Sequence, residues 1–303
     1  MLRMNSTLTA SRPAPVSLSP LIIACLAATW LVWGSTYFAI KYALISFPPF
    51  FQMGSRFLVA GLGLLAWMAA RGTPLPSARQ WRNALIVGTL MLAGGMGGTA
   101  YSEQTVGSGL VVAFIAVVPM MIAVVNLCFG IRPRKLEAAG IVVGLVGVLM
   151  LTQGAGFQAS PAGLAAIAIA CVTWSVGSVL SQRTLPLAPG PMGFASEMVC
   201  GGVVLLALSW LNGEAPQWPP QAVSAAAWAY LVVFGSLIAF NAYMVLLARA
   251  SAGLASSYTF VNPVIAMLLG VAVGGEHVTA FEWQAVAVVL AGVVLLVWKP
   301  AAR

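Results

Sequence analysis

Acidic and titratable residues are scarce in this 303-residue chain. It contains six acidic residues, all of them glutamate, and one histidine, and only 7% of its residues are charged, against roughly 25% in an average soluble domain. No two glutamates occur at helical spacing within an apolar stretch, and no G-x-x-x-x-G-K-S/T phosphate loop occurs. The sequence therefore excludes a water-soluble fold and argues against both an embedded enzyme and a nucleotide-driven pump.

Cysteine is also rare, and the basic residues are dispersed. Cys25, Cys128, Cys171 and Cys200 lie in apolar stretches without C-x-x-C spacing, so we expect packing residues, with no metal and no cofactor. The net charge is +8, but Lys and Arg occur in short runs between long apolar stretches. This distribution leaves no basic surface for nucleic acid and is typical of loops that orient a membrane protein.

What the chain has in abundance is apolar length, at 61% apolar residues. About 20 apolar residues cross a bilayer core about 30 Å thick. Cutting the chain at its charged, proline and glycine clusters predicts ten transmembrane helices, at 20–41, 50–70, 81–101, 109–129, 137–151, 162–181, 191–211, 222–248, 253–274 and 281–298. Residues 1–19 are expected to form a disordered N-terminal tail. The predicted fold is an all-α integral membrane protein.

The loops between these spans differ sharply in charge. Alternate loops collect nearly all the Lys and Arg outside the spans, and the opposite set contains only Lys41. Because cytoplasmic loops are rich in Lys and Arg, both termini are predicted to be cytoplasmic.

An internal repeat organises the chain. Residues 108–119 match 252–263 at an offset of 144, and at an offset of 141 Trp33 falls on Trp174 and Arg56 on Glu197. We therefore expect two five-helix repeats, 20–153 and 154–303. Five is an odd number, so the second repeat enters the membrane from the opposite side and the repeats are inverted. Inverted repeats are a recurring plan of secondary transporters.

Several short motifs resemble a known family. The first span reads W-G-S-T-Y-F-A-I-K over 33–41 and the second R-F-L-V-A-G over 56–61; near the C-terminus, Gly275–Glu276 precede E-W-Q at 282–284 and V-L-A-G-V at 289–293. Together these resemble the EamA-type transporters of the drug/metabolite transporter superfamily, and among them the bacterial amino-acid exporters. The resemblance implies ten helices in two inverted halves, a multi-pass protein of the bacterial inner membrane, and a small-molecule substrate such as an amino acid.

This resemblance favours a secondary transporter that exports amino acids by alternating access around a central cavity. The alternatives are a passive channel or facilitator for small solutes, and an exporter of another metabolite or a drug. The oligomeric state stays open, a monomer included, and the lipid bilayer is the other expected partner.

Two charges fall well inside predicted spans, away from the span ends, where charge is costly. Arg56 and Glu197 each lie about two turns into a helix and are expected to approach opposite faces of the membrane. Arg56 is either functional or snorkels toward its helix end. Glu197 either binds a substrate ammonium or a proton, or forms hydrogen bonds to neighbouring helices.

Aromatic and amide side chains at mid-membrane positions are the candidate solute contacts, with packing as the alternative. The set consists of Trp30, Trp33, Tyr37, Tyr101, Trp174, Ser178, Asn241, Tyr243, Tyr258 and Asn262. Pro119 and Pro263 are each expected to interrupt a mid-membrane helix, producing either a hinge or a static kink.

The orientation can be tested in the loop at 73–79. In a background without the native cysteines, Thr73→Cys should react with a membrane-impermeant maleimide only after the cells are opened, whereas Lys41→Cys should react in intact cells. Labelling of Thr73→Cys in intact cells would contradict both the orientation and the inversion argument.

Overall fold

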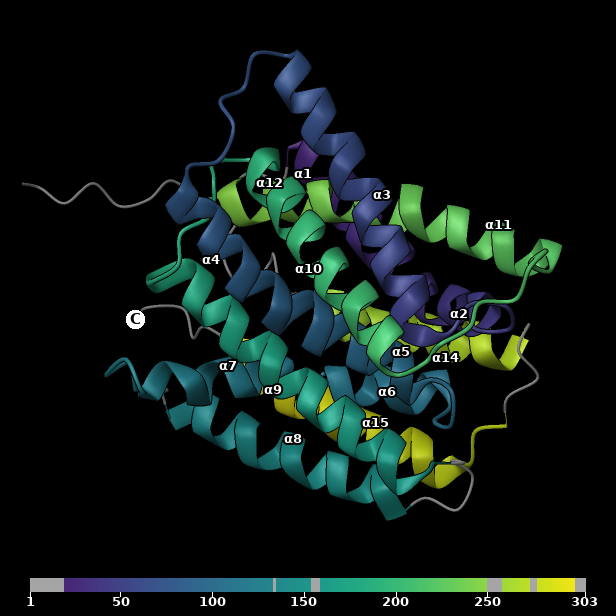
Figure 1. Ribbon diagram of the computed structural model, residues 1–303. Helices are drawn as coiled ribbons and strands as arrows, with labels where there is room; N and C mark the ends of the chain where they lie inside the picture. Colours follow the sequence, from purple (N-terminus) through teal and green to yellow (C-terminus); the bar gives the residue numbers. More distant parts are fainter. Residues whose placement is uncertain (1–18, 133–134, 154–158, 250–257, 273–276, 298–303) are drawn as a thin grey trace, which may run out of the picture.

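The computed structural model describes residues 19–132, 135–153, 159–249, 258–272 and 277–297, and these residues form helices and connecting loops without a β-strand (Figure 1). Three of the described helices each contain one π-helical segment, labelled η1, η2 and η3. The first half comprises α1 Pro20–Ala27, η1 Ala28–Val32, α2 Trp33–Ala43, α3 Pro49–Ala70, α4 Ala78–Gly88, η2 Thr89–Gly97, α5 Gly98–Ser102, α6 Ser108–Ile115, α7 Val118–Leu127 and α8 Lys135–Gln153. The second half comprises α9 Pro161–Arg183, α10 Pro191–Leu211, α11 Ala222–Tyr230, η3 Leu231–Ile238, α12 Ala239–Arg249, α14 Tyr258–Ala272 and α15 Ala280–Val297.

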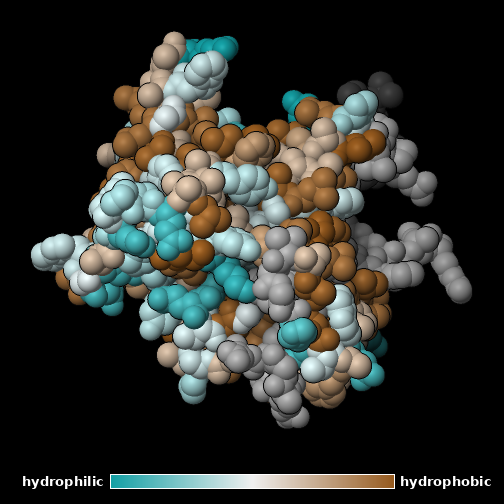
Figure 2. Space-filling view, turned by 90° about the vertical axis from the view of Figure 1, so that its right-hand side faces the viewer, coloured by the Kyte–Doolittle hydropathy of each residue, from teal (hydrophilic) through white to brown (hydrophobic). Residues whose placement is uncertain are grey.

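Six of these helical stretches are long and apolar enough to cross a bilayer: 20–43, 49–70, 78–102, 161–183, 191–211 and 222–243. The other four predicted spans coincide with α6–α7, α8, α14 and α15, which are shorter within the described residues. The chain is therefore an all-helical, multi-pass membrane protein, and the count of ten spans stays a prediction. Hydrophilic residues gather near the middle of one face, with apolar residues around them (Figure 2).

Local hydrogen bonds explain where several helices begin. Ser77 and Gln80 form a capping box at the start of α4, and Thr279 and Glu282 bond reciprocally at the start of α15. These bonds satisfy helix N–H groups that have no partner within the first turn. The α3 N-terminus is capped from a distant loop, because Glu214 accepts hydrogen bonds from the backbone N–H groups of residues 50 and 51 at 3.1 and 2.8 Å.

The two predicted proline interruptions have different outcomes. The interruption at Pro119 is present: α6 ends at Ile115 and α7 begins at Val118. The interruption at Pro263 is absent, because α14 is continuous from Tyr258 to Ala272. Proline removes one helical hydrogen bond but has a helical φ, so a helix can continue through it when its surroundings satisfy the freed carbonyl.

Equivalent helices of the two halves pack against each other and run antiparallel. In the α3–α10 pair, a β-carbon at Gly61 would lie 2.8 Å from the backbone N of Val199, and one at Gly202 would lie 2.8 Å from that of Leu58. The α8–α15 pair has the same form, since a β-carbon at Gly147 would lie 2.6 Å from Val289 N. α8 and α15 lie together at the lower edge of the bundle in Figure 1. Glycine allows these backbones to approach this closely.

Gly61 and Gly63 provide a matched test of this contact on one helix. A methyl group at Gly61 would meet the α10 backbone, whereas a β-carbon at Gly63 would have nothing within 4 Å. We expect Gly61→Ala to lower the melting temperature of the detergent-purified protein, because overpacking costs about 1–3 kcal/mol. Gly63→Ala should leave it unchanged or higher. Equal melting temperatures for the two variants would show that the close α3–α10 backbone contact at Gly61 does not contribute to stability.

Candidate functional site

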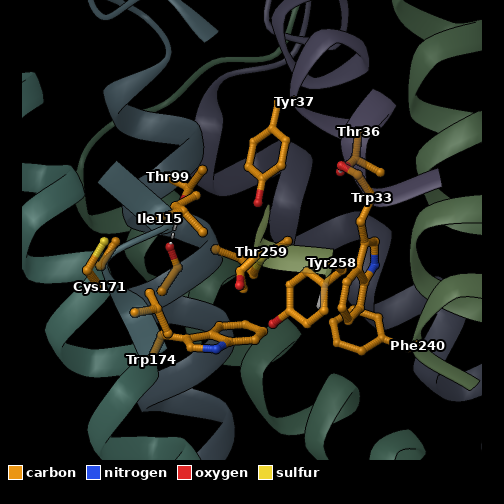
Figure 3. A pocket seen from close by; sticks show the side chains of 14 residues that line it. Trp33, Thr36, Tyr37, Thr99, Ile115, Cys171, Trp174, Phe240, Tyr258 and Thr259 are labelled. Atoms are coloured by element: carbon orange, nitrogen blue, oxygen red, sulfur yellow. Dashed lines mark hydrogen bonds between the residues drawn. The ribbon is translucent and has the colours of Figure 1, made fainter. Parts of the chain in front are cut away.

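A cavity lies in the middle of the bundle, between helices of both halves (Figure 3). Its empty space, including the open solvent at its mouth, is about 560 Å³. The residues lining it are Trp33, Thr36, Tyr37, Gly95, Met96, Thr99, Ile115, Val118, Ala170, Cys171, Trp174, Phe240, Tyr258 and Thr259. The repeat-related pair Trp33 and Trp174 thus contributes to one space.

Trp33 is fixed tightly in one wall. Its indole N–H donates to the carbonyl of Gly235 at 3.2 Å, and only 7% of the residue is exposed. Its ring centroid lies 4.7 Å from that of Tyr258 and 5.2 Å from those of Phe240 and Tyr243. Edge-on contacts of this kind hold aromatic rings in defined orientations. Trp33 therefore both packs the interior and forms part of the cavity wall.

Trp174 lies on α9 at the opposite wall and is only partly buried. Space for its ring depends on η2, because a β-carbon at Gly95 would lie 2.9 Å from Trp174 Cε3. The glycine-rich run 94–98 therefore makes room for this ring in addition to allowing helix contact. The native thiol of Cys171 lines the same wall, one helical turn from Trp174.

A few hydroxyl groups make this largely aromatic cavity amphipathic. Thr36 donates to the carbonyl of Trp33 at 2.7 Å, and Thr99 donates to that of Gly95 at 2.8 Å. Their oxygens keep acceptor capacity after donating to their own helices. The Tyr37 hydroxyl points toward the middle of the cavity in Figure 3. Such a cavity can hold an apolar body together with a small number of polar groups.

All three π-helical segments border this region. η1 ends immediately before Trp33, η2 supplies Gly95 and Met96, and η3 supplies the Gly235 carbonyl that binds the indole. Short π-helical turns often occur at functional sites, where the wider turn redirects side chains. Hydropathy contains no signal for them, and the glycine run in η2 was the available hint.

The structure brings Trp33, Tyr37, Trp174 and Tyr258 together among the expected solute contacts. Tyr243 lies directly behind them, with its ring centroid 5.6 Å from that of Tyr258. Sequence reasoning did not single out Thr36, Thr99, Thr259 or Phe240, and it treated Cys171 and Gly95 as structural.

The remaining candidates lie outside the cavity lining. Tyr101 is 39% exposed and stacks on Phe50, and Ser178 contacts the Met91 sulfur at 3.9 Å. Asn241 donates to a carbonyl of its own helix.

Trp30 and Asn262 lie side by side near the cavity but do not line it. When the side-chain amide of Asn262 is oriented so that both its oxygen and its nitrogen are satisfied, the nitrogen donates to the carbonyls of Trp30 and Tyr258 at 3.0 and 3.1 Å. Helix carbonyls thus take up the side-chain amides of both asparagines.

Arg56 does not snorkel, and that alternative is wrong. Its side chain is fully buried and turned inward, where Nε donates to Ser236 Oγ at 2.9 Å and the guanidinium lies 4.7 Å from the centroid of the Phe57 ring. Partners inside the protein replace the aqueous headgroup region.

Glu197 lies on α10 and is only 2% exposed. It acts electrostatically on Tyr243 and Cys200. Because Gly61 faces Val199 in the antiparallel pair, Arg56 and Glu197 lie about 10 Å apart along the helix axis at 1.5 Å per residue. They lie toward opposite ends of this pair.

Comparison with known proteins identifies the fold family. The chain matches the EamA-like transporter family twice, over residues 18–153 and 161–298. The chain belongs to this family. As a member of the EamA-like family, the protein is a membrane transporter of small solutes.

Relatives agree with this assignment. "Uncharacterized inner membrane transporter YedA" of Escherichia coli K12 is 43% identical over 277 residues, covering 91% of this chain and 90% of that protein. Protein PecM of Dickeya dadantii is 26% identical, with 79% and 80% covered. A WAT1-related chloroplastic protein of Arabidopsis thaliana is 26% identical, with 89% and 68% covered.

A solved crystal structure has the same fold, with a TM-score of 0.67 at 24% identity. It covers 92% of this chain and 98% of that one.

The two cavity tryptophans should differ in their contribution to stability. We expect Trp33→Ala to lower the melting temperature strongly, because removing a packed aromatic side chain costs about 3–5 kcal/mol in soluble cores. Trp174→Ala should lower it less, since Trp174 is only partly buried. Trp33→Phe, which loses the bond to Gly235 but keeps a ring, should fall between. A larger loss for Trp174→Ala would reverse the assigned roles.

Proposed function

We propose that this transporter exports amino acids across the bacterial inner membrane by alternating access around the central cavity. The observation that carries the proposal is the shared cavity of Trp33 and Trp174, which occupy equivalent positions in the two repeats. A site on a pseudo-symmetry axis can be exposed to either side by rocking one repeat against the other.

The antiparallel α3–α10 and α8–α15 pairs support inverted halves, which fit ten spans with both termini cytoplasmic. Alternating access also needs contacts that can break. The loop between α2 and α3 is joined to the one between α10 and α11: Ser46 accepts backbone hydrogen bonds from Gln217 at 2.9 Å and Gln221 at 3.0 Å. We assign these bonds to the outer gate, which opens when they separate.

The chemistry of the cavity wall supports an amino-acid substrate. Aromatic rings and the Thr36, Thr99 and Thr259 hydroxyls suit a small solute with an apolar part and a polar part. Glu197, buried on α10, is the candidate for proton coupling. Other metabolites and drugs, and passive flow through a channel, are the competing activities.

Counterflow in proteoliposomes tests the proposal. Vesicles loaded with unlabelled L-leucine, L-phenylalanine or L-threonine should take up the labelled amino acid faster than empty vesicles, since a carrier reorients faster when occupied. Trp174→Ala should reduce this exchange per folded molecule at least several-fold. Trp210→Ala, which removes an indole that is 80% exposed on α10, is the matched control and should retain it. Saturable uptake that is not accelerated by the unlabelled amino acid inside the vesicles would indicate a channel. Equal exchange by Trp174→Ala and Trp210→Ala would contradict the assignment of the cavity as the solute site.

A further inference from the structure

The Arg56 guanidinium is a buried cation with an unused donor. Nε is bonded to Ser236, and Nη1 has a weak contact of 3.6 Å with the Met53 sulfur. Nη2 is buried and has no hydrogen-bond partner among the residues that the structure describes. Arginine presents its donors as a planar fork that matches a carboxylate. A guanidinium with one strong partner therefore retains capacity for an oxyanion.

This donor lies behind one wall of the cavity, which Arg56 itself does not line. A β-carbon at Gly235 would lie 3.6 Å from Arg56 Nη2 and 3.2 Å from the methyl carbon of Thr36, so both groups flank the same point on η3. Thr36 lines the cavity, and the Trp33 indole is bonded to the carbonyl of the same glycine. The guanidinium therefore lies just behind the wall that these two residues form.

Two buried charges of opposite sign act on this part of the cavity wall. Arg56 interacts with Tyr37, whose hydroxyl points into the cavity, and is attracted by the Glu103 carboxylate. Glu103 lies at the C-cap of α5 and is 8% exposed. In a low-dielectric interior the Arg56 cation attracts a negative group on a solute, and that group competes with the Glu103 carboxylate for the cation.

We propose that Arg56 recognises the carboxylate of the transported solute through Nη2, which restricts the substrates to carboxylate-bearing molecules. The inference rests on the proposed function and narrows it. The Trp33, Tyr37, Trp174 and Tyr258 rings contact the apolar part of the solute, and Arg56 binds its charged end.

The test compares each amino acid with its carboxamide, which lacks the carboxylate. Unlabelled L-leucine, L-phenylalanine and L-threonine, and their carboxamides, compete for exchange of the labelled acids in proteoliposomes held at zero membrane potential. In the wild type, the carboxamide should compete at least tenfold less well than the acid, while the N-acetyl amino acid should still compete. Arg56→Gln should reduce the acid-to-amide discrimination to less than threefold.

Two further variants separate recognition from folding. Arg56→Lys keeps the positive charge but loses the planar guanidinium, and the acid should still compete more than threefold better than its carboxamide. Ser224→Ala removes a buried hydroxyl that bonds to the carbonyl of Tyr42, leaves Arg56 and Ser236 in place, and should discriminate between acid and amide as the wild type does. The wild-type comparison holds even if Arg56→Gln fails to fold. Equal competition by acid and amide in the wild type, or undiminished discrimination in folded Arg56→Gln, would overturn the inference alone. Absence of exchange for every amino acid would overturn the proposed function and this inference with it.

Discussion

At the contact of α3 with α10, the backbone of each helix lies against a glycine of the other, Gly61 against Val199 and Gly202 against Leu58. Within a bilayer, helices satisfy their own backbone hydrogen bonds, so association depends on close packing, which small residues allow. The same arrangement recurs where α8 meets α15. These pairs hold the two repeats together in antiparallel fashion, and only then do the faces of α2 and α9 reach one cavity.

The polar groups around that cavity are mostly satisfied within the protein. The Thr36 and Thr99 hydroxyls bond to their own helices, and the Trp33 indole bonds to η3 of the other repeat. The wall itself is therefore stable without a solute and almost uncharged, and the buried Arg56 cation and Glu103 carboxylate are two charges that act on it from behind. Some contacts between the halves, such as that of Trp33 with Gly235, are single neutral hydrogen bonds, each worth only about 0.5–1.5 kcal/mol. Others, such as Arg56 with Ser236 and Glu214 with the start of α3, involve a charged group. The rocking of the halves that we propose would exchange the neutral contacts at modest cost.

The sequence predicted the positions of the helical segments well because hydropathy and length decide what can cross a bilayer. The equivalence of Trp33 and Trp174 was also visible, since the repeat offset survives in the sequence. Hydropathy could not predict which way a side chain faces around its helix. Tyr101 stacks on Phe50 near the surface, and Asn241 donates a hydrogen bond to its own helix instead of facing the cavity. Snorkelling of Arg56 and a break at Pro263 were wrong because both depend on tertiary partners. The π-helical segments have no simple sequence signal.

Met96 lines the cavity and is only partly buried, so a cysteine at this position can report whether a solute occupies the space. In a Met96→Cys variant that lacks the four native cysteines, the rate of modification by a small water-soluble methanethiosulfonate is followed in proteoliposomes with increasing amounts of a transported amino acid. If the cavity between the two repeats is the solute site, the amino acid should slow modification several-fold, with half-protection near its half-saturating concentration for exchange. Modification at the same rate with and without a saturating solute would contradict the account.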